Sequence, residues 1–433
     1  MKENLWEIRD PIYGFIEINE WERDIINHPA FQRLRRIRQL ALTDMVYPGA
    51  MHTRFEHSLG VMYVATKIFD NIVNECKNIL KVDYGYNEDG LNKMRTIIRL
   101  AALLHDVGHA PFSHASESIM PHKDQEKIYK HEDYSGAIIK TIFKDVIENN
   151  KLNNNYNIKA EEVAAFVEKD YKILKKSFFW TDIISGQVDA DRIDYLLRDS
   201  YHAGVQYGVF DLKRLLKTIV MIHTDEGFIL GFNEGGLHVA ESLIFARYYM
   251  FTQVYFHHTR RAYDHHIANA EKEILLKLKY KDGKMKPPDN EENINDYLDW
   301  DDWKVGYLIK KNRDLNDCNI ILDRKHDRCV YHTNEVPNIC DLEKFNNAYE
   351  KLSNEINQSF VDEAEKSFYN IGNEDIKILK ENESGKVEIL PLSQLSNAIK
   401  NIQAIKQKRI YVPFNEQKKA IEILRKEGLY DGE

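Results

Sequence analysis

The chain has 433 residues, of which 43% are hydrophobic and 30% are charged, and its formal net charge is −9. This length predicts two or three structural units with a sizeable buried interior. The negative balance argues against a surface built for long nucleic acid, although it is compatible with a small basic pocket for a phosphorylated molecule. No run approaches the ~18 apolar residues of a membrane helix, and the opening MKENLWEIRDPIYG lacks a secretory pattern, so we expect no membrane association and a cytoplasmic location.

The chain contains no CxxC pair, and its four cysteines are Cys76, Cys318, Cys329 and Cys340. The last three lie in a polar region that also carries His326 and His332. A zinc site would require tighter spacing, so these residues are expected to be reduced thiols.

The first elements expected along the chain are a hairpin and a helix. Residues Pro11–Ile18 alternate partly between apolar and polar types, which predicts a short hairpin with Gly14 at its turn. Residues 21–40 then place Ile25, Phe31 and Ile37 at helical spacing, which predicts a helix.

A series of helices is expected next. The pattern from His57 to about Leu80 is helical, and Thr96–His105 is apolar almost all round, as in a helix buried in a core. Further helices are expected near 131–148, 160–169 and 189–199. Residues 219–232 predict a β-hairpin that turns at Asp225–Gly227, and a long helix is expected from about Leu237 towards Lys279.

The composition changes after Lys279. The following stretch is polar and acidic and contains Pro287–Pro288, which indicates a linker or a surface excursion. The tail shows β-like runs at 376–380, 386–390 and 409–412, with helical stretches at 392–404 and 415–427. We therefore expect a mainly α protein, with a short amino-terminal hairpin, a helical core over 1–280, a linker over 281–310 and a small α+β region over 311–433.

Four polar residues stand out as candidate metal ligands: His57, His105, Asp106 and Asp191. A buried apolar helix rarely ends in His-Asp-x-x-His unless those groups have a partner, because burying them alone costs several kcal/mol. Two imidazoles and two carboxylates suit one divalent cation such as Mn, Fe, Co, Ni, Zn or Mg. Such a cation activates water and offsets charge on a phosphoryl group.

Further histidines follow closely at His109, His114 and His131. Each alone is compatible with a surface or hydrogen-bonded core histidine. Together, beside a metal ligand pair, they predict proton donors at the site.

These residues carry a family resemblance. The order H…HD…D with HDVGHAPFSH in the middle resembles the HD phosphohydrolase superfamily. The segments DPIYGFIEI, FQRLRRIRQL, YPGAMHTRFEHSLGV, VDADRIDYLLRDSYHAGV and RRAYDHH extend the likeness to its deoxynucleoside triphosphate triphosphohydrolases, including dGTPase-like enzymes, over roughly residues 8–275. The resemblance implies an HD-domain helical core and places His57, His105, Asp106 and Asp191 on the metal ligands.

The resemblance also implies roles around the metal. His109, His114 and His131 fall on histidines around the scissile phosphate, His109 as a phosphate contact and the other two as proton-transfer residues. The positions that match substrate contacts are Arg54 and Arg192 for phosphate, Gln39, Tyr195 and Asp199 for the sugar, and Tyr263 for the nucleoside. Glu117 stands where relatives have an aspartate that orients a histidine, and Tyr255 replaces a phosphate-contacting arginine. A guanidinium such as that of Arg54 can grip phosphate with two nitrogens.

Arg33 and Arg35 resemble arginines that hold a regulatory nucleotide at a subunit interface; a solvated basic face is the alternative. The resemblance implies hydrolysis of a deoxynucleoside triphosphate to deoxynucleoside and tripolyphosphate, with nucleotide activation and a homo-oligomer, dimer or tetramer, as further expectations. Two other functions stay open: hydrolysis of another nucleotide phosphoester, and nucleotide sensing without catalysis.

Overall fold

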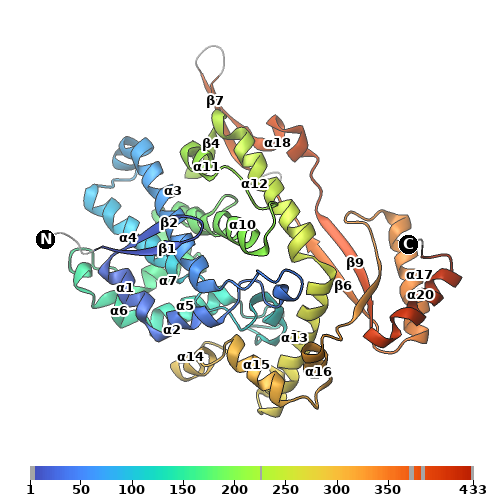
Figure 1. Cartoon of the computed structure of the whole chain (residues 1–433). Coiled ribbons are helices and arrows are strands. Elements are labelled where there is room, and N and C mark those ends of the chain that lie inside the picture. The colour runs from blue at the N-terminus through green and yellow to red at the C-terminus, as the bar shows by residue number, and fades with distance from the viewer. Residues whose placement is uncertain (1–4, 225–226, 370–374, 382–385, 431–433) are drawn as a thin grey trace.

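The computed structural model describes residues 5–224, 227–369, 375–381 and 386–430. Helices dominate, with a small hairpin near the amino terminus and short strands and helices in the carboxyl-terminal part (Figure 1). The predicted fold class, mainly α with these two β-containing parts, is therefore confirmed. No helix in the described parts of the chain is both long and apolar enough to cross a membrane.

The amino-terminal hairpin consists of β1 (Trp6–Asp10) and β2 (Gly14–Ile18). Its turn is closed by Asp10, whose Oδ1 accepts hydrogen bonds from the backbone N–H groups of Ile12 (2.8 Å) and Tyr13 (2.9 Å). The hairpin was expected, but it starts earlier, and Gly14 opens the second strand with φ +83°, a conformation that favours glycine.

The helix expected over 21–40 is broken into three pieces: α1 (Glu20–Asn27), α2 (Pro29–Gln32) and the 3₁₀ turn η1 (Arg33–Arg36). Pro29 causes the break, because proline lacks the N–H that would continue α1 and disfavours the helical conformation of the residue before it. His28 is accordingly extended, and its Nδ1 accepts the N–H of Ala30 at 3.2 Å. The periodicity was correct within each piece, but the proline redirects the chain.

Five longer helices form the core around the candidate site: α3 (Arg54–Val82), α4 (Glu88–Leu104), α5 (His131–Thr141), α7 (Ala160–Glu168) and α10 (Ala190–Ala203). All five were expected from apolar spacing. Shorter helical pieces precede, connect or follow them: η2 (Thr43–Met45), η3 (Ser113–Ile119), α6 (Lys144–Glu148), η4 (Lys151–Asn155), α8 (Tyr171–Leu174), η5 (Lys175–Thr181), α9 (Asp182–Ser185) and α11 (Leu212–Thr218).

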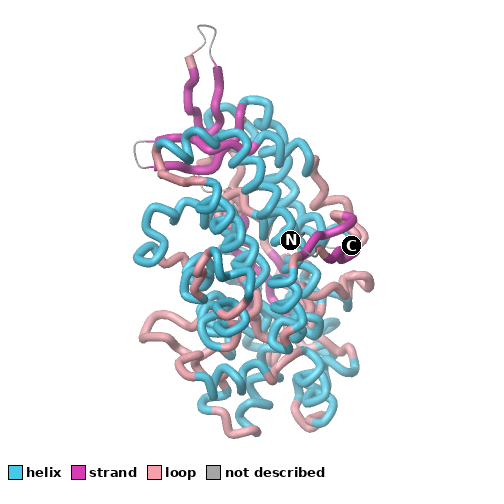
Figure 2. Tube along the Cα trace, turned by 90° about the vertical axis from the view of Figure 1, so that its left-hand side faces the viewer, coloured by secondary structure: helices cyan, strands magenta, loops and turns pink. Residues whose placement is uncertain are grey.

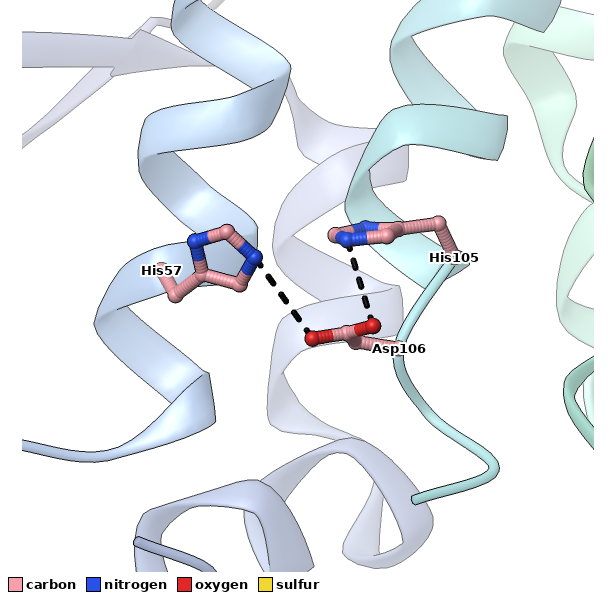
Figure 3. Close-up of side chains that lie close together, drawn as sticks. All are labelled: His57, His105 and Asp106. Carbon is pink, nitrogen blue, oxygen red and sulfur yellow. Dashed lines mark ion pairs between the residues drawn. The ribbon is translucent and has the colours of Figure 1, made fainter. Parts of the chain in front are cut away.

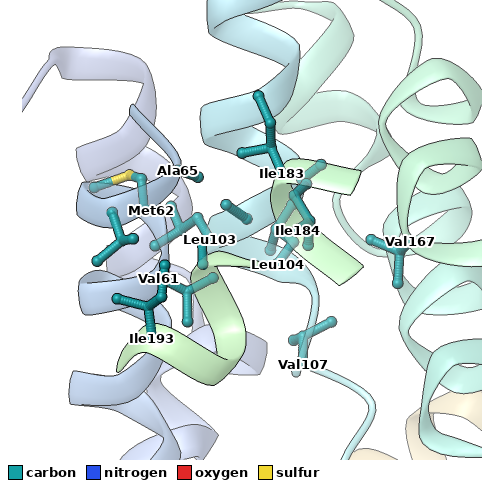
Figure 4. Close-up of a cluster of buried hydrophobic side chains, with 14 of the residues drawn as sticks. Val61, Met62, Ala65, Leu103, Leu104, Val107, Val167, Ile183, Ile184 and Ile193 are labelled. Carbon is teal, nitrogen blue, oxygen red and sulfur yellow. The ribbon is translucent and has the colours of Figure 1, made fainter. Parts of the chain in front are cut away.

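The interior between these helices is densely filled. Figure 4 shows fully buried side chains from three of them: Val61, Met62 and Ala65 of α3, Leu103 and Leu104 of α4, and Ile193 of α10. Truncating a buried leucine to alanine typically costs about 2–5 kcal/mol. Because Leu103 and Leu104 directly precede His105, this packing also fixes the end of α4 that carries the site.

A four-stranded sheet joins the core to the carboxyl-terminal part. The expected hairpin is present as β3 (Ile219–Thr224) and β4 (Gly227–Asn233), and residues 225–226 of its expected turn lie outside the described residues. β4 pairs in parallel with β7 (Lys377–Glu381), which pairs with β8 (Val387–Pro391). Figure 2 shows this sheet at one end of the molecule, at the top of the view.

The long helix expected from 237 to 279 is interrupted. It consists of η6 (Glu234–Gly236), α12 (Leu237–Met250), the π-helical turn η7 (Phe251–Tyr255) and α13 (His258–Lys277). The π-turn inserts an extra residue, and π-turns of this kind frequently occur at functional sites. His257 then leaves helical geometry and caps α13 by accepting the N–H of Thr259 at 3.2 Å.

The segment expected to be a linker, 281–310, contains η8 (Lys281–Gly283), α14 (Glu291–Leu298) and the start of α15 (Asp302–Lys311). Tyr297 and Trp300 are 1% exposed, and the Tyr297 hydroxyl donates to the backbone oxygen of Gly108 at 2.7 Å. α14 and α15 were not expected from the sequence because each helix buries only one face, so its composition is mostly polar. The division of the chain at 280 and 310 stays a prediction.

The remaining elements form an α+β layer: α16 (Asn316–Asp323), β5 (Arg328–His332), α17 (Ile339–Glu355), β6 (Phe360–Lys366), α18 (Leu392–Leu395), α19 (Asn397–Lys400), β9 (Ile405–Val412), η9 (Phe414–Glu416) and α20 (Gln417–Lys426). β9 lies between β5 and β6 and is antiparallel to both. In Figure 1 α17 and α20 lie beyond this sheet, away from the helical core. β5, β6 and α17 were not expected, whereas β7–β9 and α20 were.

Candidate metal and phosphate site

The candidate metal ligands come from the ends of three helices. His57 lies in the first turn of α3, His105 and Asp106 follow the end of α4, and Asp191 lies in the first turn of α10. Nε2 of His57 lies 3.0 Å from Oδ1 of Asp191 and 3.5 Å from Oδ2 of Asp106. Nε2 of His105 lies 3.3 Å from Oδ1 of Asp106 and 3.8 Å from Oδ1 of Asp191. Figure 3 shows both imidazoles turned towards the Asp106 carboxylate.

The outer nitrogen of each ring is already engaged. Nδ1 of His57 lies 2.8 Å from Oδ2 of Asp194, and Nδ1 of His105 lies 2.8 Å from the backbone oxygen of Ala102. Arg198 in turn holds Asp194 through two nitrogens, each at 2.9 Å. These outer partners fix the ring orientation and direct Nε2 of both histidines into the centre, as in many metal sites.

The donors fit a divalent cation. Both Nε2 atoms are buried and, among the described residues, neither makes a hydrogen bond. Burial alone would lower the pKa of His57. The carboxylates of Asp191 and Asp194 outweigh burial and raise this pKa to about 10, so the cluster favours a positive charge between the rings and the carboxylates. A cation held by His57, His105, Asp106 and Asp191 would satisfy all four groups, and the mixed N/O set suits several metals.

Arg54 joins the metal site to the neighbouring cleft. Its side chain is 4% exposed; Nη1 forms an ion pair with Oδ2 of Asp106, and Nε donates to Oγ of Ser113 at 2.8 Å. Burial would raise the pKa of Asp106, but the Arg54 guanidinium and nearby imidazoles hold it well below its ordinary value. Asp106 therefore remains an ionised carboxylate.

The three further histidines gather beside the metal ligands. Nε2 of His109 lies 3.2 Å from Oδ1 of Asp106, and its ring stacks on that of His131 at 3.9 Å. The His114 ring lies 5.3 Å from that of His109, and Nδ1 of His114 pairs with Oε1 of Glu117 at 2.7 Å. Glu117 thus orients His114 despite its extra methylene.

The two inner histidines are held neutral. Burial, Arg54 and His131 lower the pKa of His109 well below its ordinary value, and burial also lowers the pKa of His131. Asp106, His109 and His131 also bring donor atoms within 4.8 Å of one another, so they form a second group able to hold a cation. His131 has two competing roles in this geometry, proton transfer and metal binding.

A cavity of about 910 Å³ opens beside these groups. Its wall includes ten of the residues expected at the site: Gln39, Arg54, Asp106, His109, His114, His131, Asp191, Arg192, Tyr195 and Asp199. Arg192 is bound to Oδ2 of Asp189 at 2.5 Å, and the Asp199 carboxylate accepts from Tyr255 at 2.6 Å and pairs with His52 at 2.7 Å. Tyr255, which stands where an arginine was expected, therefore fixes Asp199.

Tyr263 lies away from this cavity. It is fully buried, and its ring lies 4.7 Å from that of His326. The structure thus does not bring the expected nucleoside contact together with the other substrate residues.

Arg33 and Arg35 occupy different environments. Arg33 is 1% exposed and donates to three backbone oxygens, those of Trp300 (2.8 Å), His109 (2.8 Å) and Val107 (3.4 Å). Arg35 is exposed and lies over the Phe55 ring at 3.5 Å. A solvated basic face therefore describes Arg35 alone, and the regulatory role of both stays a prediction.

Some residues at the site were not found from the sequence. Asp194 and Arg198 carried a usable signal, since they are spaced three and seven residues after Asp191 on one helix. Arg247, Phe251 and Lys366 also line the cavity, but they belong to no motif. Only the packing of the carboxyl-terminal part against α12 reveals them.

Two family models match the chain: the HD domain over residues 54–198 and the HD associated region over residues 210–420. A solved structure of a hypothetical protein from Aquifex aeolicus is 31% identical, with a TM-score of 0.77, and the match covers 97% of this chain and all of that one. The chain belongs to the HD family. The predicted resemblance is thereby confirmed, and it supports a phosphohydrolase role.

Curated relatives agree with this membership. An uncharacterized protein of Methanocaldococcus jannaschii is 37% identical over 287 residues, which are 66% of this chain and 53% of that protein. The deoxynucleoside triphosphate triphosphohydrolase SAMHD1 of Bos taurus is 30% identical over 400 residues, 82% of this chain and 63% of that protein. The chain spans about half the length of the first curated relatives it matches.

Proposed function

We propose that this HD protein hydrolyses deoxynucleoside triphosphates to deoxynucleoside and tripolyphosphate, with one divalent cation at His57, His105, Asp106 and Asp191. The observation that carries the proposal is one cavity whose wall combines two of the proposed metal donors, Asp106 and Asp191, with three histidines, Arg54, Gln39 and Tyr195. The likeness to the triphosphohydrolase of Bos taurus supports this choice over another nucleotide phosphoester.

The chain's own residues account for the handling of the phosphate. Arg54 and His109 lie where they can bind oxygens of the α-phosphate, Arg54 with fixed positive charge. When bound, the cation would lower the pKa of a water molecule and offset charge on a phosphoryl oxygen. Water attacks the α-phosphorus, and the bond from phosphorus to the 5′ oxygen breaks.

The leaving 5′ oxygen requires a proton. Glu117 fixes Nδ1 of His114, which leaves Nε2 of that ring for the transfer. His131, stacked on His109, is the second proton-transfer candidate. A positioned acid or base of this kind typically contributes about 10²–10⁴-fold to the rate.

Sugar recognition is assigned to Gln39 and Tyr195, with Asp199 behind them. An added 2′-hydroxyl against the Tyr195 ring would clash or lack a partner. The oxygens of Asp199 are engaged by His52 and Tyr255, so Asp199 is fixed before substrate binds. A homo-oligomer, an activating nucleotide near Arg35 and a cytoplasmic location complete the proposal.

The deciding experiment measures tripolyphosphate release from each of the four deoxynucleoside triphosphates. The other three are added in turn as activators, and metal-depleted protein serves as the control. Release of tripolyphosphate that requires metal is the expected result. Inorganic phosphate or pyrophosphate as first product would instead assign the chain to a different phosphoester, and no hydrolysis would favour a sensor.

A further inference from the structure

Two cationic side chains approach one aromatic ring in the wall of the catalytic cavity. Arg247 belongs to α12 and Lys366 is the last residue of β6, and both line the cavity. The Cζ atom of Arg247 lies 5.9 Å from the ring centroid of Phe251, and Nζ of Lys366 lies 5.2 Å from it. The π-helical turn that begins at Phe251 places this ring between the two elements.

Among the described residues, neither Arg247 nor Lys366 has a carboxylate as an ion-pair partner. Across residues 5–224, 227–369, 375–381 and 386–430, no carboxylate forms an ion pair with Arg247 or Lys366, whereas Arg192 has Asp189 and Arg261 has Asp362. Arg247 is only 9% exposed; its Nη1 donates to the backbone oxygen of Phe368 at 2.9 Å, and its buried Nε has no partner among these residues. A buried charge without a counter-charge is unfavourable unless a ligand supplies one.

The surroundings indicate an anion with several charges. Burial, Arg247 and Arg192 lower the pKa of Lys366 and outweigh Glu117, which raises it, so Lys366 is repelled by both arginines. A second cavity of about 440 Å³ adjoins the first, and Arg192 and Arg247 line both. All three cations line the first cavity, so an anion bound there would meet Arg192, Arg247 and Lys366.

We propose that Arg247 and Lys366 form a polyphosphate subsite that binds the phosphates farthest from the scissile bond and retains the tripolyphosphate product. The inference rests on the proposed function, since Arg54 and the metal ligands occupy the α-phosphate end of the same cavity. Lys366 lies in the HD associated region rather than in the HD domain. The carboxyl-terminal part thus completes the substrate site and selects for chain length of the phosphate.

The test is calorimetric binding of inorganic tripolyphosphate and of orthophosphate to the metal-loaded full chain. Lys366→Gln and Arg247→Gln should weaken tripolyphosphate binding by about tenfold to a hundredfold, as for lost charge-assisted hydrogen bonds. Orthophosphate binding should change by less than about threefold, because Arg54 and the metal suffice for one phosphate. Lys366→Arg should retain most of the affinity.

Lys406→Gln is the matched control. Lys406 lies on the neighbouring strand β9, is exposed and pairs with Glu365 at 3.3 Å, so its loss removes the same charge outside the cavity. Unchanged tripolyphosphate affinity in Lys366→Gln would overturn the inference, as would an equal loss in Lys406→Gln. Because Arg247→Gln also removes a bond to Phe368, Arg247→Lys and circular dichroism separate charge from folding.

Kinetics distinguish failure of this inference from failure of the proposed function. In Lys366→Gln, KM for a deoxynucleoside triphosphate should rise by about tenfold or more while kcat changes little. Hydrolysis with an unchanged KM rejects the subsite alone. The opposite result is also distinguishable. If the wild type hydrolyses no deoxynucleoside triphosphate but binds tripolyphosphate in a way that depends on Lys366, the proposed function is rejected and the proposed subsite is retained.

Discussion

Nδ1 of His57 lies 2.8 Å from Oδ2 of Asp194, both side chains being fully buried. Burial would raise the pKa of Asp194, but Arg198 and His57 hold it at about 2, so the carboxylate stays ionised and accepts the Nδ1 proton. Because this contact keeps a proton on Nδ1, Nε2 is the nitrogen of His57 that would offer its lone pair to a bound cation. The proposed metal site therefore depends on Asp194, which is not among its proposed ligands.

Asp194→Asn should weaken metal binding by about 10–100-fold, the usual effect of losing an outer partner of a ligand histidine. The asparagine amide can donate to Nδ1 of His57 as well as accept from it, so it no longer selects the tautomer with the proton on Nδ1. Metal titration by calorimetry measures the change. Asp10→Asn is the control, because Asp10 also binds Arg198, at 2.9 Å, but does not contact His57. Equal losses in both variants would show that the effect passes through Arg198.

Asp106→Ala and His105→Ala should each lose metal and activity together, while circular dichroism shows that the helices persist. Both residues follow the end of a packed helix and belong to the group of donors that could hold a metal ion. Metal content by mass spectrometry and turnover are measured on the same sample. Full turnover by metal-free Asp106→Ala would refute the assignment.

His131→Ala should keep the metal and lower the rate by about 10²–10⁴-fold, as expected for a lost acid or base. His131 also belongs to the donor group with Asp106 and His109. If the variant loses a metal ion, His131 is a ligand and the proton-transfer role passes to His114. Glu117→Gln supplies the comparison, since it alters only the partner of His114.

Hydrolysis in ¹⁸O-labelled water should place the label on tripolyphosphate and leave the deoxynucleoside unlabelled. The reason is that water attacks the α-phosphorus in the proposed reaction, so the bond that breaks lies between phosphorus and the 5′ oxygen. Mass spectrometry of both products measures the outcome. Label in the nucleoside would mean attack at the 5′ carbon and would contradict the proposed reaction.

The wild type should prefer dGTP to GTP and dATP to ATP by about tenfold to over a hundredfold, since an unsatisfied buried hydroxyl costs about 1–3 kcal/mol. Tyr195→Ala and Gln39→Ala should reduce this ratio of kcat/KM values. Equal hydrolysis of ribonucleotides by wild type would reject the substrate class. A ratio unchanged in both variants would move the sugar contact to Asp199, tested by Tyr255→Phe, which removes its donor.

Arg33→Gln should lower the free energy of unfolding by about 2–5 kcal/mol, because it leaves buried carbonyls without a donor. Arg35→Ala should cost less than about 1 kcal/mol, since Arg35 is exposed and loses mainly its contact with the Phe55 ring. Urea unfolding measures both. If both variants lower the free energy of unfolding by similarly small amounts, the hydrogen bonds of Arg33 do not stabilise the contact between η1 and the segment that joins α14 to α15.

Much of the site was predictable because its residues are close in sequence. His105, Asp106 and His109 share one turn, and Asp191 and Tyr195 share one helix face, so helical periodicity brought them together before any tertiary contact was known. The same reasoning failed at Pro29 and at the π-turn after Met250, where one residue ends an otherwise helical pattern. It also missed α14 and α15, whose single buried faces are hidden by acidic composition.

The helical core, the candidate metal donors and the histidines beside them could all be predicted from the sequence, because these features depend on local spacing and on residue chemistry. Which cations line the cavity follows instead from the packing of distant segments. Arg33 turned inward to backbone oxygens, and Tyr263 was buried away from the cleft. Arg247 and Lys366 met at the Phe251 ring because the end of β6 and Phe368 after it contact α12 and the π-helical turn. Those outcomes depend on contacts between distant segments, which local periodicity does not encode.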